Sequence, residues 1–459
     1  MPPWFLGIRC GPGSSVLARG ESTALGRSRT QERLAGWTAS RWLTLAASVL
    51  GAFCCGFCYA WSVLLNPFMD TYGWTTAQVS LSFTAVNAAA AVTPLLAGKA
   101  LQYLAPRTLM LLGGVIFGLG IGSLGLARSL TSLYGFGILA GFGGGLIYPG
   151  ATMANLMRLF PERRGLASGL LTGGFGLGTV VWAPAAVAMV ADWGISWTLG
   201  LMGAVFFLVV ALCSRLVVTA PPLAESSTLS PLPGLSSPSR QPGRPRTFQL
   251  AQPSRTDRDW KHMLLTPVFW ILALLFVIGI TSGTMIIGHA SPIAQRLLGL
   301  SPEAAGLVVS LVALGMMAGK MCWGALSDRI GRTPVLAAML VLAVLALLSV
   351  WQTTLYFSVV GGMFVVGTCY GGFLALIGPV TTDAFGARHV GTNFGIMYLS
   401  VAVALFLGPR LAAVASEKSG GDYDWAFLIA ALMSAVGLLL VGAYVLLQRQ
   451  RGTQPVPEK

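Results

Sequence analysis

Gly324-Ala325-Leu326-Ser327-Asp328-Arg329-Ile330-Gly331-Arg332 joins two apolar segments of the chain, 302–326 and 332–351. Each segment has the length needed to cross a lipid bilayer, which takes about 20 residues. The glycines allow a tight turn, and Asp328 stands near a helix end. By itself, the stretch with Gly324, Asp328, Arg329, Gly331 and Arg332 can be an ordinary solvated turn between two spans.

The composition of the whole chain is that of a membrane protein. Of its 459 residues, 55% are hydrophobic and 10% are charged, and the mean hydropathy is +0.74. The net charge of +14 comes from cations in short loops between apolar spans, which is an orientation signal and not a nucleic-acid surface. The sequence has no catalytic constellation, phosphate loop or metal-ligand spacing. We therefore expect a polytopic membrane protein that is not an enzyme and needs no cofactor or metal.

Apolar windows long enough to span a bilayer recur about twelve times and predict an all-α protein. We place the spans at 41–65, 77–104, 107–127, 130–157, 164–191, 196–218, 266–297, 302–326, 332–351, 354–383, 389–415 and 423–447.

The spans form two sets of six, which predicts halves at 41–218 and 266–447. Between them, 219–265 is rich in Pro, Ser and Arg, and we expect a flexible, largely disordered tether. Residues 1–40 and 448–459 are predicted to be tails, and a transit peptide is the alternative for the first.

Most arginines and lysines fall at one end of the spans. By the positive-inside rule, both tails and the central loop are expected in the cytoplasm, with the protein in the inner (plasma) membrane. We expect the lipid bilayer as its surroundings, no nucleic-acid partner, and a monomer.

The two halves repeat each other. The interval from Gly165 to Gly169 equals that from Gly391 to Gly395, and prolines stand at comparable places in both halves. A duplication of this kind implies pseudo-symmetric halves with the solute bound between them near the membrane midplane.

Lys320 is the one cation that we can place deep inside a span, because Gly306 to Trp323 contains no other charge. An ammonium group at this depth costs several kcal/mol unless it faces a partner or a watery cavity, so it marks a functional site. An exchangeable anion is the natural partner. The alternative is a lysine that extends toward the cytoplasmic surface.

The nine-residue loop is similar to the conserved cytoplasmic loop motif of the major facilitator superfamily, in its second-half copy. The resemblance implies a gating motif formed by Gly324, Asp328, Arg329, Gly331 and Arg332, in which the arginines can pair across a closed cytoplasmic gate, and the solvated turn is the alternative. The counterpart from Gly98 to Arg107 lacks the aspartate, so gating by the first half is expected to depend on other contacts. Within the superfamily, the chain from Arg41 to Leu447 resembles the oxalate/formate antiporter family and its monocarboxylate transporter relatives. The stretches that carry this resemblance include Tyr59-Ala60-Trp61-Ser62, Asn66-Pro67, Gly288-His289-Ala290-Ser291-Pro292 and Gly391-Thr392-Asn393-Phe394-Gly395.

The resemblance implies a twelve-helix major facilitator fold that moves a small carboxylate. In that family a basic residue of span eight, usually arginine, binds the substrate carboxylate, and Lys320 occupies its place. A lysine is a compact charge that can lose its proton when it is desolvated, so it also suits proton coupling.

The substrate class rests on a second comparison within the family. Similar oxalate carriers add a cation in span eleven, but here none occurs between Tyr398 and Leu405, and Arg410 comes only after Pro409. This favours a monocarboxylate such as formate, lactate or pyruvate. An oxalate/formate-type exchanger and a membrane carboxylate sensor without flux remain alternatives.

Further binding candidates are polar residues inside the spans: Tyr59, Asn66, Tyr148, Tyr370 and Tyr398. They can offer hydrogen bonds to an anion and apolar walls to its carbon part, although each alone is more often a packing residue, or an interfacial one for a tyrosine near a span end. His289 is a candidate for proton coupling, and a helix-capping or packing role is the alternative. The sequence leaves open whether a proton or a counter-anion accompanies the substrate.

Overall fold

The structure is a computed structural model that describes residues 39–58, 64–220, 257–353, 355–418 and 423–452. Every regular element in these residues is helical. The N-terminal half contains the helix Ala39–Cys58, α2 (Leu65–Tyr72), α3 (Thr76–Ala100), α4 (Pro106–Leu124), α5 (Leu130–Gly145), η2 (Leu146–Ala151), α6 (Thr152–Leu159) and α7 (Arg164–Leu216). The remainder contains α8 (Trp260–Leu264), α9 (Pro267–Ile287), α10 (Ala290–Leu298), α11 (Pro302–Ile330), α12 (Arg332–Gln352), α13 (Tyr356–Phe385), α14 (Val390–Lys418) and α15 (Asp424–Gly452).

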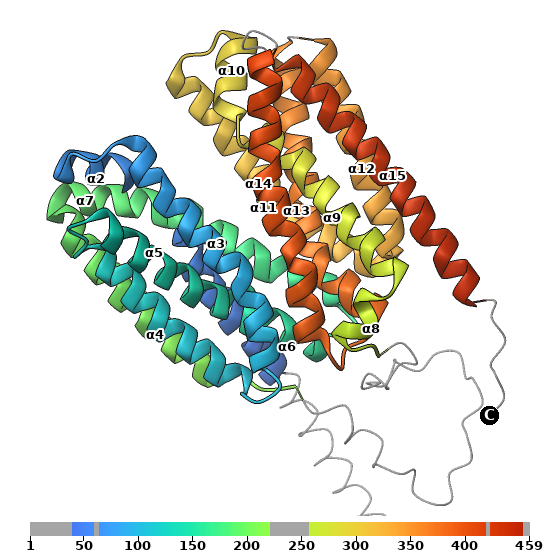
Figure 1. Cartoon of the computed structure of the whole chain (residues 1–459), viewed down its shortest axis with the longest axis horizontal. Helices are drawn as coiled ribbons and strands as arrows, with labels where there is room; N and C mark the ends of the chain where they lie inside the picture. The colour runs from blue at the N-terminus through green and yellow to red at the C-terminus, as the bar shows by residue number, and fades with distance from the viewer. Residues whose placement is uncertain (1–38, 59–63, 221–256, 354, 419–422, 453–459) are drawn as a thin grey trace, which may run out of the picture.

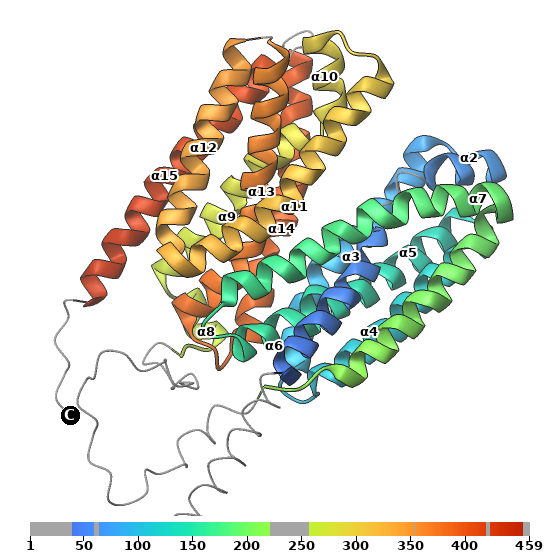
Figure 2. The same ribbon diagram turned by 180° about the vertical axis from the view of Figure 1, so that it is seen from behind.

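The described helices provide the twelve predicted passes. Eleven of the described helices are long and apolar enough to cross a membrane. One of them, α7, has 53 residues, which is enough for two crossings. It is broken at Gly194, whose φ of 75° and ψ of 166° lie in a region that glycine alone adopts readily. Figure 2 shows the chain reversing direction along α7. The predicted spans 164–191 and 196–218 are the two arms of this element.

Of the first predicted span, 41–65, the structure describes the helix Ala39–Cys58 and the start of α2, with residues 59–63 outside the described residues. Two other predicted spans are less regular than the sequence suggested. The fourth changes from α5 to the π-helical turn η2 after Gly145, and η2 contains Pro149, which has no N–H to donate. The seventh is divided into α9 and α10 at Gly288 and His289.

The two halves lie side by side and diverge toward the end that carries α2 and α10 (Figure 1). One buried apolar cluster belongs to the N-terminal half and includes Phe117 and Phe206, and another, including Phe427, belongs to the C-terminal half. A third cluster draws on both halves and includes Phe160, which follows α6, as well as Phe373 of α13. The halves therefore share a core where they converge. We call this the closed end and the opposite end the open end.

Glycines allow the closest approach between the halves. A Cβ added to Gly165 would overlap the carbonyl oxygen of Gly324, and one added to Gly98 would overlap that of Gly391. In each pair, a glycine at the start of one helix, α7 or α14, meets a glycine near the end of a helix of the other half, α11 or α3. The two contacts are pseudo-symmetric, as the sequence repeat predicts.

The last residues of the central segment are ordered, which differs from the expectation of a largely disordered tether. The N–H of Arg258 donates to the carbonyl of Phe385 at 3.0 Å, and the Asn393 amide donates to the carbonyl of Arg258 at 2.8 Å. Asp259 accepts the N–H of His262 and so caps α8. Residues 221–256 of the predicted tether lie outside the described residues.

Candidate functional site

A cavity of about 260 Å³ lies between the two halves. Helices α3 and α7 and the turn η2 line it from one half, and α11, α13 and α14 line it from the other. Its lining residues in the described part of the chain are Asn87, Ala90, Ala91, Tyr148, Pro149, Phe175, Gly176, Thr179, Val180, Ala313, Met316, Met317, Lys320, Tyr370, Leu374, Tyr398, Val401 and Leu405. Because both halves line the cavity, a relative movement of the halves would change the contacts of a solute bound there.

Lys320 is the one charged residue among these lining residues. Only 5% of it is exposed, and within the described chain its ammonium group has neither a hydrogen-bond acceptor nor a carboxylate partner. Its Nζ lies 5.9 Å from the ring centre of Phe175. A buried charge without a counter-charge is costly, so an anion that enters the cavity gains a strong electrostatic attraction.

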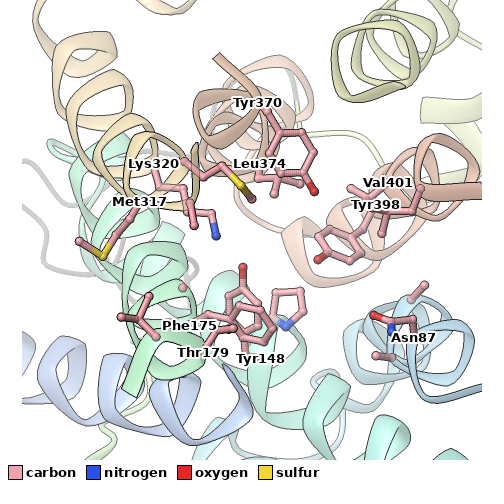
Figure 3. A pocket seen from close by; sticks show the side chains of 18 residues that line it. Asn87, Tyr148, Phe175, Thr179, Met317, Lys320, Tyr370, Leu374, Tyr398 and Val401 are labelled. Carbon is pink, nitrogen blue, oxygen red and sulfur yellow. The ribbon is translucent and has the colours of Figure 1, made fainter. Parts of the chain in front are cut away.

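Three of the predicted tyrosines lie around the same cavity as Lys320. Tyr148 comes from η2, Tyr370 from α13 and Tyr398 from α14. Figure 3 shows their hydroxyl groups directed into the space in front of the Lys320 ammonium. Phenolic hydroxyls can donate hydrogen bonds to a carboxylate, so the arrangement suits an anion whose charge is met by Lys320.

Tyr148 owes its position to an irregular backbone. Its φ of −131° and ψ of 124° are not helical, and the residue stands inside the π-helical turn before Pro149. Its ring stacks on that of Phe175 of α7, with centroids 4.8 Å apart and an interplanar angle of 27°. π-Helical turns are frequent at functional sites because they redirect a side chain without ending the helix.

The other sequence candidates are placed differently. Tyr59 lies outside the described residues, and Asn66 belongs to α2, near the open end of the N-terminal half (Figure 1). His289 stands at the N-cap position of α10, away from the cavity lining, and its ring lies 5.6 Å from that of Tyr423. The proton-coupling role of His289 and its capping or packing alternative stay predictions.

Arg410 does not supply a second charge to the cavity. It is exposed on α14, is absent from the cavity lining, and stacks on Phe406 at 4.4 Å from the ring centre. Among the described lining residues there is also no carboxylate. No group of three or more His, Cys, Asp or Glu side chains is arranged for a metal ion anywhere in the described ranges.

The predicted gating motif makes a charged contact with the other half. Asp328, at the end of α11, accepts the backbone N–H groups of Gly165 at 2.9 Å and Leu166 at 2.8 Å. These N–H groups belong to the first turn of α7, where a helix has no backbone acceptor of its own for them, and the N-cap residue of α7 makes no side-chain bond to them. Asp328 therefore caps a helix of the opposite half, where a carboxylate is also favoured by the helix dipole.

An ion-pair network extends this contact. Arg332 binds Asp328 at 2.8 Å and Asp383 at 2.9 Å, and Asp383 also pairs with Arg164 of α7. Arg329, by contrast, is exposed and takes part in none of the hydrogen bonds or ion pairs found between described residues. Of the two arginines predicted for the gate, Arg332 alone lies in the network. Arg164 and Asp383 were not predicted as gate residues, and the two lie 219 positions apart in the chain.

The first half makes the equivalent contact without charge. Gln102 stands where the repeat would place an aspartate, and its amide donates to the Thr392 hydroxyl at 3.2 Å, near the start of α14. Thr392 in turn donates to the carbonyl of Gly98 at 3.3 Å. Nearby, Arg158 donates to the carbonyls of Ala387 at 3.0 Å and Arg388 at 2.6 Å. The closed end thus has one charged and one largely neutral set of contacts.

Comparisons with known proteins agree with this architecture. The chain is 27% identical to the oxalate:formate antiporter of Oxalobacter formigenes over 413 residues, which is 88% of this chain and 91% of that protein. It is 28% identical to monocarboxylate transporter 11 of Homo sapiens over 363 residues, covering 74% of this chain and 68% of that protein.

Solved structures share the fold at low sequence identity. FucP in the outward conformation aligns with a TM-score of 0.66 at 15% identity and covers 88% of this chain and 99% of its own. The human organic anion transporter MFSD10 (TETRAN) gives a TM-score of 0.66 at 14% identity, with 87% and 99% covered. The sequence profile of the Major Facilitator Superfamily matches residues 48–301 and 281–459. Since this match takes in most of both halves, the chain belongs to the Major Facilitator Superfamily of membrane transporters.

Proposed function

We propose that this transporter carries small monocarboxylates, such as formate, lactate or pyruvate, by alternating access. The observation that carries the proposal is the buried ammonium group of Lys320, which faces a cavity between the halves with three tyrosine hydroxyls directed toward the same space. A carboxylate bound there would neutralise Lys320 and accept hydrogen bonds from the tyrosines. Similarity to the oxalate:formate antiporter and to monocarboxylate transporter 11 supports this substrate class.

The transport cycle follows from the two ends of the molecule. In this conformation the contacts of Asp328 and Gln102 hold the closed end together, while the halves diverge toward the open end. Binding of the anion would favour closure of the halves around it, and rupture of the closed-end contacts would then release it on the other side. We infer that the closed end faces the cytoplasm, because arginines gather there, as the positive-inside rule requires.

The decisive experiment is uptake of labelled formate, lactate, pyruvate and oxalate into proteoliposomes, with and without a pH gradient and an internal counter-anion. Lys320→Gln keeps a polar side chain of similar length but removes the charge, and it should lower monocarboxylate uptake by about 30-fold or more, because loss of one partner of a buried charge pair costs about 2–5 kcal/mol. Arg329→Gln removes an exposed cation of the same helix and is the matched control. Normal uptake by Lys320→Gln would refute the anchoring role.

The same assay separates the second candidate, an oxalate/formate-type exchanger, which the 27% identity to the Oxalobacter antiporter favours. Exchange would appear as oxalate uptake that depends on internal formate or oxalate and ignores the pH gradient. A monocarboxylate uptake that rises with external acid would instead support proton symport. The single cation of the described cavity lining favours a monoanion, because a second carboxylate there would lack a counter-charge.

A further inference from the structure

The cavity has more room, and a more apolar wall, than its charge alone requires. Its volume of about 260 Å³ approaches the range of about 300–1,000 Å³ that is usual for drug-sized ligands. A water molecule takes about 30 Å³ of liquid, so formate, with its few heavy atoms, would leave most of the space to solvent. Apart from Lys320, the C-terminal half lines the cavity largely with Met316, Met317, Leu374, Val401 and Leu405.

An aromatic surface lies directly beside the charge. The rings of Phe175 and Tyr148 are stacked 4.8 Å apart, and the Lys320 ammonium lies 5.9 Å from the Phe175 centroid. A carboxylate that pairs with Lys320 therefore places its first carbon atoms next to the Phe175 and Tyr148 rings. A flat or branched apolar group attached to that carboxylate can pack on these rings in the offset or edge geometry that aromatic side chains prefer.

The far end of the cavity carries a hydrogen-bond acceptor. Asn87 of α3 lines the cavity opposite Lys320, and Figure 3 shows its amide directed inward from the N-terminal half. Its Nδ2 donates to the carbonyl of Phe83 at 2.8 Å, and a carbonyl can only accept, which assigns the nitrogen to that side. The Oδ1 of Asn87 is then the atom offered to the cavity. It attracts a donor group and repels a second carboxylate.

We propose that the substrates of this carrier are monocarboxylates with an aromatic or branched apolar body and a hydrogen-bond donor at the end opposite the carboxylate, with Asn87 as the residue that selects for the donor. This inference rests on the proposed function and narrows it. The carboxylate pairs with Lys320, the body packs between the Phe175 and Tyr148 rings and the aliphatic wall, and the donor reaches Asn87. Formate and oxalate are poor ligands by this reasoning, since one lacks the body and the other adds an unpaired charge.

The test is uptake of labelled formate, lactate, phenylacetate and 4-hydroxyphenylacetate into proteoliposomes at about pH 8, where these acids are ionised. Liposomes with Lys320→Gln supply the background of passive entry. Burial of a phenyl group should raise uptake efficiency about 10- to 150-fold over formate, and the hydroxyl should add a further factor between about two and ten. Asn87→Leu should remove the preference for 4-hydroxyphenylacetate over phenylacetate. Thr84→Leu, an exposed position on the same helix, is the control and should retain it.

The outcomes separate this inference from the function on which it rests. If formate or lactate enters faster than both aryl acids while Lys320→Gln is inactive, the inference is overturned and the monocarboxylate carrier stands. If no acid exceeds the Lys320→Gln background, the proposed function itself fails. Should Asn87→Leu not insert into the membrane, the ratio of the two aryl acids in the wild type decides, and equal uptake refutes the role of Asn87.

Discussion

Replacement of Asp328 by Asn should weaken the closed end selectively. The carboxylate accepts two backbone N–H groups of α7, at 2.9 and 2.8 Å, and pairs with Arg332 at 2.8 Å. Asn can accept only through its Oδ1, so one N–H of α7 is left without an acceptor and the charge is lost. Arg332 retains Asp383. Hydrogen bonds to charged groups contribute about 1.5–3 kcal/mol each. We therefore expect the conformation with the closed end formed to lose about 2–3 kcal/mol of stability, which shifts its equilibrium with the conformation in which that end is open by roughly 30- to 150-fold.

The assay is the distance distribution between spin labels at Tyr103→Cys and Ile330→Cys, which are exposed positions at the closed ends of the two halves. Cys10 and the exposed Cys322 are replaced by Ser for this purpose. Asp328→Asn should move population from the short to the long distance, while Arg329→Gln, the neighbouring exposed charge, should leave the distribution unchanged. An Asp328→Asn distribution identical to that of the wild type would refute the idea that this helix cap in trans holds the closed end.

Three further predictions follow from the closed end and the helix break. Gln102→Leu removes a neutral hydrogen bond and should shift the same spin-label equilibrium by about 1 kcal/mol, roughly fivefold, and a shift as large as that of Asp328→Asn would contradict the neutral assignment. Gly165→Val should keep the closed end from forming, because even a Cβ overlaps the backbone of the other half, and unchanged label distances would argue against that contact. Gly194→Ala should lower the free energy of unfolding by about 1–3 kcal/mol, because the residue has a positive φ, and the measurement is a lower Tm in detergent. Gly200→Ala is the control: it lies in a helix with open space around it and should not lower the Tm.

Hydropathy was sufficient for the number of passes and insufficient for their irregularities. A run of apolar residues has nearly the same composition whether it forms one helix, as in α12, or two, as at the junction of α9 and α10. The π-helical turn at Tyr148 interrupts the helix without changing the average hydropathy of the window around it. Of these irregular places, the reversal near Gly194 was the one that coincided with a boundary predicted between two spans.

The candidate site was predicted in part. Lys320 stood out because a charge in an apolar span is rare, and Tyr148, Tyr370 and Tyr398 lie around the same cavity. Asn87 and Phe175 were missed, since one polar or aromatic residue in a span carries no sign of the face on which it lies. Lipid is as apolar as a protein core, so the amphipathic pattern that orients helices in soluble proteins is weak here. The binding roles of all these residues stay predictions.

The order of residues alone established an all-helical membrane protein with a duplicated arrangement of spans, a buried cation and a charged loop motif. These features are local: the cost of burying polar groups in lipid acts on each segment separately. Which side chains meet was decided by the packing of one half on the other. The capping of α7 by Asp328, the replacement of a charged contact by Gln102 and Thr392, and the gathering of tyrosines around Lys320 all join residues distant in the chain. Such pairings depend on helix rotation and on the relative position of the halves, which exist only once the chain has folded.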